Sequence, residues 1–280
     1  MANTEKKNTF KRRLGTMLKV DFKRLFLSRA FYIIVASCLV APILILVMTS
    51  MMDGTVSVDP QTGKETVIEG FDNVWQIIGS VNDLSANTNP SPEEGAGMAA
   101  MDMSITSMCN INMLYFAIAA LVCVFVADDF RSGYAKNLFT VRAKKTDYVA
   151  SKTLVLTFGA SIMIFAFFVG SLIGGAVSGV SFVMDGFNIV NLFMCVICKM
   201  VLVSVFVPIY LIMSVAAKQK LWLSILLSMM VGMFLFMMIP MLTPLNATVI
   251  HIVLCVAGGV GFAYGLGAIS NLILKKTSLV

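Results

Sequence analysis

The chain has 280 residues, of which 58% are hydrophobic and only 13% are charged, with a net charge of +6 and a mean hydropathy of +0.89. Soluble domains have about 25% charged and 45–50% apolar residues. This composition therefore excludes an ordinary soluble domain, a disordered chain, a nucleic-acid-binding module and a secreted disulfide scaffold. It predicts an integral membrane protein.

Six continuous apolar stretches are long enough to cross a bilayer. A helix of about 21 residues is about 32 Å long, close to the ~30 Å hydrocarbon core. Because membrane β-strands need alternating segments of about ten residues, these unbroken stretches predict an all-α membrane protein. The six predicted transmembrane helices are Phe31–Met52, Ser107–Ala127, Thr153–Val177, Asn188–Val215, Leu221–Met241 and Val249–Leu274.

The basic residues predict the orientation of these spans. Nineteen of the 21 lysines and arginines lie on one side, in residues 1–30, in residues 128–152 and after the fourth and sixth spans. Lys64 lies on the other side and Lys199 lies within a span. Since basic residues collect in cytoplasmic loops, both termini are expected in the cytoplasm, with no cleaved signal peptide.

Residues 1–30 form the first region outside the six-span domain, which comprises residues 31–280. Within Lys11–Arg29, apolar residues recur at helical spacing and basic residues occupy much of the remaining circumference. This pattern predicts a basic amphipathic helix that lies in the cytoplasmic interface of the membrane. It would serve as a topology signal and lipid anchor, or in addition as a docking site for a cytoplasmic partner.

The external loop 53–106 carries nine acidic residues against one lysine. A loop of this length is either functional or flexible. It would cover an outward opening or attract cations toward one, or it is simply a solvated acidic surface. A short helix is predicted over Phe71–Leu84.

The loop 128–152 joins the second and third spans and carries a distinctive pattern. Asp128 and Asp129 are predicted to cap the N-terminus of a short amphipathic helix with an aromatic face. A second helix is predicted to begin at Thr146 or Asp147 and to continue into the third span.

This arrangement resembles the membrane subunit of ABC-2 (type V) transporters, whose second and third spans are joined by an acidic-x-Arg-x-Gly element that opens a coupling helix, followed by basic residues. Tyr134 departs from the threonine that is frequent there, and Ala143 lies where proline is often found. The residues that match in order are Asp129, Arg131, Gly133, Lys145 and Lys152.

The resemblance implies the permease subunit of a bacterial exporter in the plasma membrane. It implies a partner ABC ATPase, present in two copies per transporter, which would hold ATP and Mg. It also implies a second permease subunit, with which this chain forms a homodimer or a heterodimer. Membrane lipid is a further expected partner, and nucleic acid is not. The implied ATPase-coupling residues are Asp128, Asp129, Phe130, Arg131, Gly133, Tyr134 and Leu138.

The chain itself lacks recognisable catalytic patterns. It contains no P-loop, no H-E-x-x-H pattern and no nucleophile elbow, and its single histidine is His251. Cys195 and Cys198 have C-x-x-C spacing, but hydrocarbon disfavours the thiolates that metal or redox chemistry needs, so we interpret them as small apolar residues. The chain is expected not to be an enzyme, and to hold no cofactor or metal.

Lys199 is the outlying polar residue within the spans. It lies about 16 Å along the helix from Asn188, where a charge costs at least about 2.5–3.5 kcal/mol. It should face the bundle, a cavity or a partner subunit, either as a structural residue or as a contact for substrate or a gating ion pair. The fifth span carries a ridge of methionines at Met229, Met233 and Met237. This ridge is a core or lipid-facing stripe, or, as the resemblance implies, it borders the transport pathway. These four residues make up the candidate substrate path.

Three GxxxG pairs predict close helix packing within the bundle or at a subunit interface. They are Gly170/Gly174, Gly175/Gly179 and Gly261/Gly265.

The function predicted from these features is ATP-driven export of an amphipathic or hydrophobic substrate, with a cationic peptide as the first choice. The acidic external loop and the methionine ridge suggest that substrate. The alternatives are an ATP-independent secondary carrier and a non-transporting membrane subunit for immunity or sensing. Internal inverted repeats would favour the carrier, and the sequence contains no convincing repeat.

Overall fold

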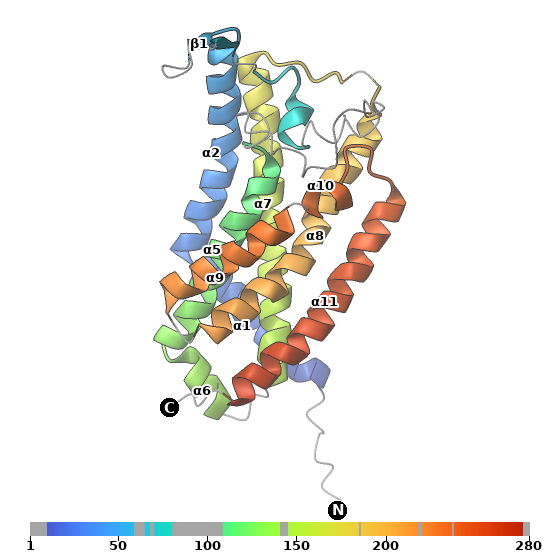
Figure 1. Cartoon of the computed structure of the whole chain (residues 1–280). Coiled ribbons are helices and arrows are strands. Elements are labelled where there is room, and N and C mark those ends of the chain that lie inside the picture. The colour runs from blue at the N-terminus through green and yellow to red at the C-terminus, as the bar shows by residue number, and fades with distance from the viewer. Residues whose placement is uncertain are drawn as a thin grey trace, which may run out of the picture.

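The computed structural model describes residues 10–58, 65–67, 70–79, 109–140, 145–184, 186–217, 220–236 and 238–276. Within these ranges the regular secondary structure consists of helices and one small hairpin (Figure 1). The hairpin pairs β1 (Val56–Val58) with β2 (Glu65–Val67) in antiparallel register. The helices are α1 (Phe10–Leu27), α2 (Arg29–Met52), η1 (Val74–Ile77), η2 (Ile111–Met113), α5 (Leu114–Arg131), α6 (Tyr134–Thr140), α7 (Lys145–Ser178), α8 (Ile189–Ala216), α9 (Leu221–Phe236), α10 (Met238–Leu242) and α11 (Val249–Lys276).

Five helical segments in the described ranges are long and apolar enough to cross a membrane. They are α2, η2 with α5, α7, α8 and α11, and they coincide with five of the six predicted spans. The prediction of an all-helical membrane protein is therefore confirmed. The helix α7 begins at Lys145, one residue before the predicted start at Thr146 or Asp147, and continues into the third span as predicted.

The fifth predicted span, Leu221–Met241, is described in two pieces. The structure has α9, with 16 residues, and the five-residue α10, and residue 237 between them lies outside the described ranges. At 1.5 Å per residue α9 is about 24 Å long, shorter than the ~30 Å hydrocarbon core. Six continuous spans are therefore not confirmed.

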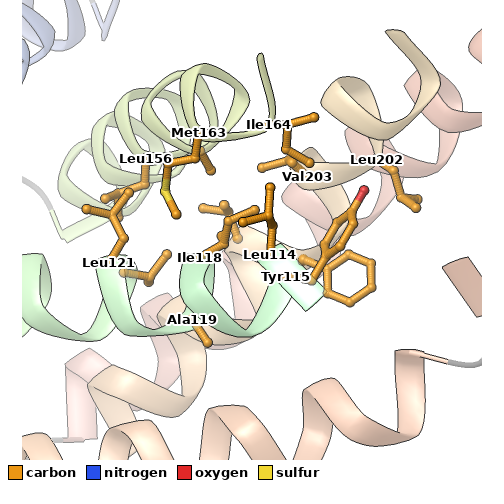
Figure 2. Packing of buried hydrophobic residues seen from close by; sticks show 14 of the residues in the cluster. Leu114, Tyr115, Ile118, Ala119, Leu121, Leu156, Met163, Ile164, Leu202 and Val203 are labelled. Atoms are coloured by element: carbon orange, nitrogen blue, oxygen red, sulfur yellow. The ribbon is translucent and has the colours of Figure 1, made fainter. Parts of the chain in front are cut away.

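The core lies between α5, α7 and α8. In Figure 2, Ile118 and Leu121 of α5 point toward Leu156 of α7, and Val203 of α8 lies beside them. All four side chains are buried. Because lipid tails are as apolar as these side chains, helices in a membrane associate through close packing rather than through removal from water. Interdigitation at this junction therefore holds the three helices together.

The pair α2 and α7 lie side by side along much of their length (Figure 1). A Cβ atom at Gly170 would overlap the carbonyl oxygen of Leu39, and one at Gly174 would lie 2.9 Å from the Cα of Ile43. The first GxxxG pair thus serves packing within the chain. Gly261 and Gly265 have no described atom within 4 Å of the corresponding position, so they face away from the bundle.

The bundle has two distinct ends (Figure 1). One end carries α6, the start of α7 and the end of α11, and we refer to it as the α6 end. The other carries the β1 hairpin, and we refer to it as the β1 end. The helix α1 packs against α7 near the α6 end.

Candidate functional site

Asp128 and Asp129 lie in the last turn of α5, which continues to Arg131. The prediction that they cap the N-terminus of the following helix is therefore wrong. The chain turns at Gly133, whose φ is +72°, and α6 begins at Tyr134. Because the C-terminal end of a helix disfavours carboxylates, these two residues need cationic partners from elsewhere in the fold.

Asp129 finds those partners in a fully buried position. Its Oδ2 atom lies 2.6 Å from the Nζ of Lys152 and accepts a hydrogen bond from the Tyr148 hydroxyl at 2.9 Å. Its Oδ1 atom is bonded by the guanidinium of Arg24. A buried charge is tolerated only when it is paired and hydrogen-bonded, and every oxygen of this carboxylate has a partner.

Asp21 of α1 is the second buried carboxylate at this place. The Nζ of Lys152 donates to its Oδ1 at 2.8 Å, and the hydroxyl of Ser151 donates to its Oδ2 at 2.6 Å. Lys152 therefore sits between two carboxylates, and all three side chains are buried. We call Asp21, Arg24, Asp129 and Lys152 the charge cluster. It carries two negative and two positive groups and joins α1, α5 and α7.

Aromatic rings enclose the charge cluster. The Nζ of Lys152 lies 4.4 Å from the ring centroid of Phe125, and the guanidinium carbon of Arg24 lies 4.1 Å from that of Tyr134. Such cation–π contacts contribute about 0.5–2 kcal/mol, more as water is excluded. Since Tyr134 is the first residue of α6, this stacking connects α6 to the cluster.

The electrostatic environment shifts the titration of two of these groups. Burial raises the pKa of Tyr134 to about 12, and the charges of Asp21 and Asp129 act in the same direction. Burial works to lower the pKa of Arg24, but the charge of Asp129 and its hydrogen bond outweigh it, so the pKa is raised. Both effects keep Arg24 positive and Tyr134 neutral at physiological pH.

A second ion pair ties α1 to α7. The Nε of Arg13 lies 2.8 Å from the Oδ2 of Asp147, whose side chain is almost completely buried. Arg24 also lies 3.1 Å from the Oδ2 of Asp128, which is exposed. The helix α1 is thus anchored through both of its halves.

The roles of Arg13, Asp21 and Asp147 were not predicted from the sequence. One signal was available for Asp21, which is the only acidic residue in α1. It lies four residues from Met17 and four from Leu25, and all three are buried. A single carboxylate within the apolar stripe of a basic helix indicates a buried cationic partner.

The predicted coupling residues divide between the cluster and its surroundings. Asp129 belongs to the charge cluster, and Tyr134 contacts it through Arg24. In contrast, Arg131 is exposed, and Phe130 and Leu138 are half-buried. The Phe139 ring packs 5.4 Å from the Tyr148 ring, which gives α6 a second contact with α7.

Lys199 is fully buried within the bundle, nearer the β1 end of α8. Its Nζ donates to the Oδ1 of Asn112 at 2.8 Å and to the Oγ1 of Thr243 at 2.9 Å. The Tyr115 hydroxyl donates to its carbonyl at 2.8 Å. Lys199 therefore links the η2–α5 segment, α8 and the turn after α10.

The predicted methionine ridge lies on a different surface. Met229 and Met233 are exposed on α9, with 41% and 65% of each side chain accessible. Met237 lies outside the described residues. Lys199 is buried whereas Met229 and Met233 are exposed, so these residues do not line one common pathway surface.

A short part of the loop 53–106 packs over the β1 end. The indole nitrogen of Trp75 donates to the carbonyl of Phe182 at 2.9 Å, and the Val74 amide donates to the carbonyl of Ser181 at 3.0 Å. A Cβ atom at Gly79 would overlap Leu245. Only the 3₁₀ turn Val74–Ile77 appears where a helix over Phe71–Leu84 was predicted, and residues 80–84 lie outside the described ranges.

A sequence model of ABC-2 family transporter proteins matches residues 17–236, from the middle of α1 to the end of α9. The chain belongs to the ABC-2 transporter family. This confirms the resemblance seen in the sequence, and the matched region contains the whole charge cluster and α6. No curated protein and no solved structure matches the chain. As an ABC-2 protein with several apolar helices, it is a multi-pass membrane component of a transport system.

Proposed function

We propose that this ABC-2 protein is the permease subunit of a type V exporter in the bacterial plasma membrane, with the α6 end and both termini in the cytoplasm. The orientation is supported by the basic residues, nineteen of which belong to segments that adjoin the α6 end. A cytoplasmic ATPase, in two copies, would hydrolyse ATP with Mg, and this chain would supply no catalytic residue.

The observation that carries this proposal is the connection of α6 to the charge cluster. A short helix at the cytoplasmic end offers the ATPase a surface, and Lys136, Asn137 and Thr140 are exposed on it. Movement of α6 would displace Tyr134, and through it Arg24 and Asp129. Because these residues join α1, α5 and α7, the movement would reach three packed helices at once. Coupling between distant sites travels through contiguous packed and charged contacts of this kind.

The transport pathway would form between two permease copies. The face of α9 that carries Met229, Met233 and the highly exposed Phe234 has no partner among the described residues, and flexible methionines accommodate varied apolar surfaces. An amphipathic, cationic peptide is the proposed substrate, because nine acidic residues in the loop 53–106 would attract it.

Lys199 would act in gating this pathway rather than in lining it. Its hydrogen bonds hold the start of α5 and the turn after α10 against α8. The segment 71–79 covers the same turn through Gly79 and Leu245. Opening the β1 end for release of a substrate would require both contacts to change.

The experiment that tests the proposal is co-purification followed by reconstitution. A nucleotide-binding chain should purify with this permease and drive transport on addition of ATP and Mg. Tyr134→Ala should insert and bind that ATPase, yet lose transport by about 5- to 30-fold, which corresponds to one or two kcal/mol. Tyr32→Ala, a change at an exposed tyrosine on α2, is the matched control and should transport normally.

Two results would contradict the proposal. Transport by the purified chain alone, without ATP, would point to a secondary carrier. A stable complex without any nucleotide-binding chain and without transport would point to an immunity or sensor subunit.

A further inference from the structure

A groove runs between α7 and α11 on a side of the bundle away from the charge cluster. It consists of two adjoining cavities of about 490 Å³ and 510 Å³. Both cavities are lined by Thr153 and Leu154 of α7 and by Val260 and Ala263 of α11, so they are continuous. The cavity farther from the α6 end also contacts α8. We call the whole feature the α7–α11 groove.

The length of the groove suits a lipid chain. Along α7 it extends from Thr146 to Ser161, which is about 22 Å at 1.5 Å per residue. One leaflet contributes about 15 Å, half of the ~30 Å hydrocarbon core. The groove therefore accommodates the depth of the leaflet at the α6 end together with part of its headgroup region.

The two cavities have room for extended hydrocarbon chains. Their volumes of about 490 Å³ and 510 Å³ are spread along the length of the groove. Ala263 and Gly267, four residues apart on α11, contribute small side chains to its wall, whereas a Cβ atom at Gly259 would overlap the hydroxyl of Ser204 on α8.

Polar atoms in the groove lack partners among the described residues. The buried Oγ1 of Thr157 takes part in no hydrogen bond within the described structure, and the buried Oδ1 of Asn271 accepts none. Thr157 lines the deeper cavity and Asn271 lines the one at the α6 end. Unsatisfied polar atoms are unfavourable at membrane depth.

The mouth of the groove is basic. Lys145 immediately precedes Thr146, and its Nζ donates to the carbonyl of Leu274, which brings the start of α7 to the end of α11. Lysines at the membrane surface attract anionic headgroups.

We propose that the α7–α11 groove binds an anionic phospholipid, with acyl chain along the groove and headgroup beside Lys145. The apolar lining selects hydrocarbon, and Lys145 at the mouth selects a negative headgroup. The binding site is independent of the proposed exporter function and of which membrane face the α6 end occupies.

Native mass spectrometry of the purified full chain tests this, after reconstitution in nanodiscs with equal amounts of phosphatidylglycerol and phosphatidylcholine. The wild-type chain should retain phosphatidylglycerol at least fivefold more often than phosphatidylcholine. Ala263→Phe fills the groove and should lose the retained lipid. Ala257→Phe, at an exposed position of the same helix that lines neither cavity, is the matched control and should retain it. Lys145→Met should keep lipid but lose the preference for phosphatidylglycerol.

A second variant guards against misfolding of Ala263→Phe. Leu154→Trp alters the opposite wall from a half-exposed position on α7, and its loss of lipid should parallel that of Ala263→Phe. Melting temperatures of all variants without added lipid identify any that are unfolded. Equal retention of the two lipids by the wild-type chain, or undiminished retention by a folded groove-filling variant, would overturn the proposal.

Discussion

The Nζ of Lys152 on α7 lies 2.6 Å from the Oδ2 of Asp129 on α5, and neither side chain has any exposed surface. Each ion would be strongly unfavourable alone in this apolar setting, so the pair exists only because α5, α7 and α1 assemble around it. The pair consequently makes the packing of three helices depend on the charge states of a few atoms.

The first prediction is that the adjacent carboxylates of Asp128 and Asp129 contribute unequally to the free energy of unfolding. Asp129→Asn removes a charge while keeping the shape, and it leaves Lys152 and Arg24 with excess positive charge in a buried site. We expect a loss of about 3–5 kcal/mol in the free energy of unfolding. Asp128→Asn is the control, because its exposed pair with Arg24 contributes about 0–1 kcal/mol. Equal losses in the two variants, measured by denaturant unfolding in detergent, would contradict the assignment.

The second prediction concerns Tyr134 and alkaline pH. Its pKa is raised to about 12 in the folded state, above the ordinary value of about 10. The folded state thus favours the neutral hydroxyl, and the stability that this contributes is complete below about pH 10 and is lost as the pH rises toward 12. In Tyr134→Phe this part of the pH dependence should disappear. Unfolding free energies over that pH window, together with tyrosinate absorbance, provide the measurement. An identical alkaline profile for both proteins would show that Tyr134 is not shielded.

The third prediction separates stability from gating at Lys199. Lys199→Met relieves a buried charge worth about 2.5–3.5 kcal/mol but leaves Asn112 and Thr243 without their donor, at about 1–3 kcal/mol. These effects nearly cancel, so the melting temperature should stay the same or rise slightly, while transport by the reconstituted complex should fall. Lys199→Arg, which keeps the charge but changes its shape, should retain partial transport. Normal transport by a folded Lys199→Met would exclude a gating role.

The fourth prediction compares two glycines that begin GxxxG pairs. Gly170→Ala places a methyl group against the carbonyl oxygen of Leu39 and should separate α2 from α7, at about 1–3 kcal/mol. Gly261→Ala meets nothing within 4 Å and should be neutral or stabilise α11 by about 0.5–1 kcal/mol, because alanine favours helix. Thermal unfolding of the two single variants is the measurement. Similar melting temperatures would mean that the α2–α7 contact is looser than described.

Local sequence was sufficient for the helices and for the family. Apolar runs of membrane length predicted the five long helices, since a hydrocarbon solvent requires backbone hydrogen bonds to close within each segment. The pattern from Asp129 to Lys152 predicted the ABC-2 relationship.

Only the tertiary structure decided which charges meet. Asp21 and Lys152 are separated by 131 positions and Arg24 and Asp129 by 105, so neither pairing leaves a periodic signal in any one segment. The same holds for Lys199, whose depth in a span was evident but whose partners, Asn112 and Thr243, come from two other parts of the chain. The sequence determined that Lys199 must face the bundle, a cavity or a partner subunit, because hydrocarbon penalises an isolated ion. The packing of α1, α5, α7 and α8 determined the pairs, because an ion pair forms only where helix positions bring two side chains within a few ångströms.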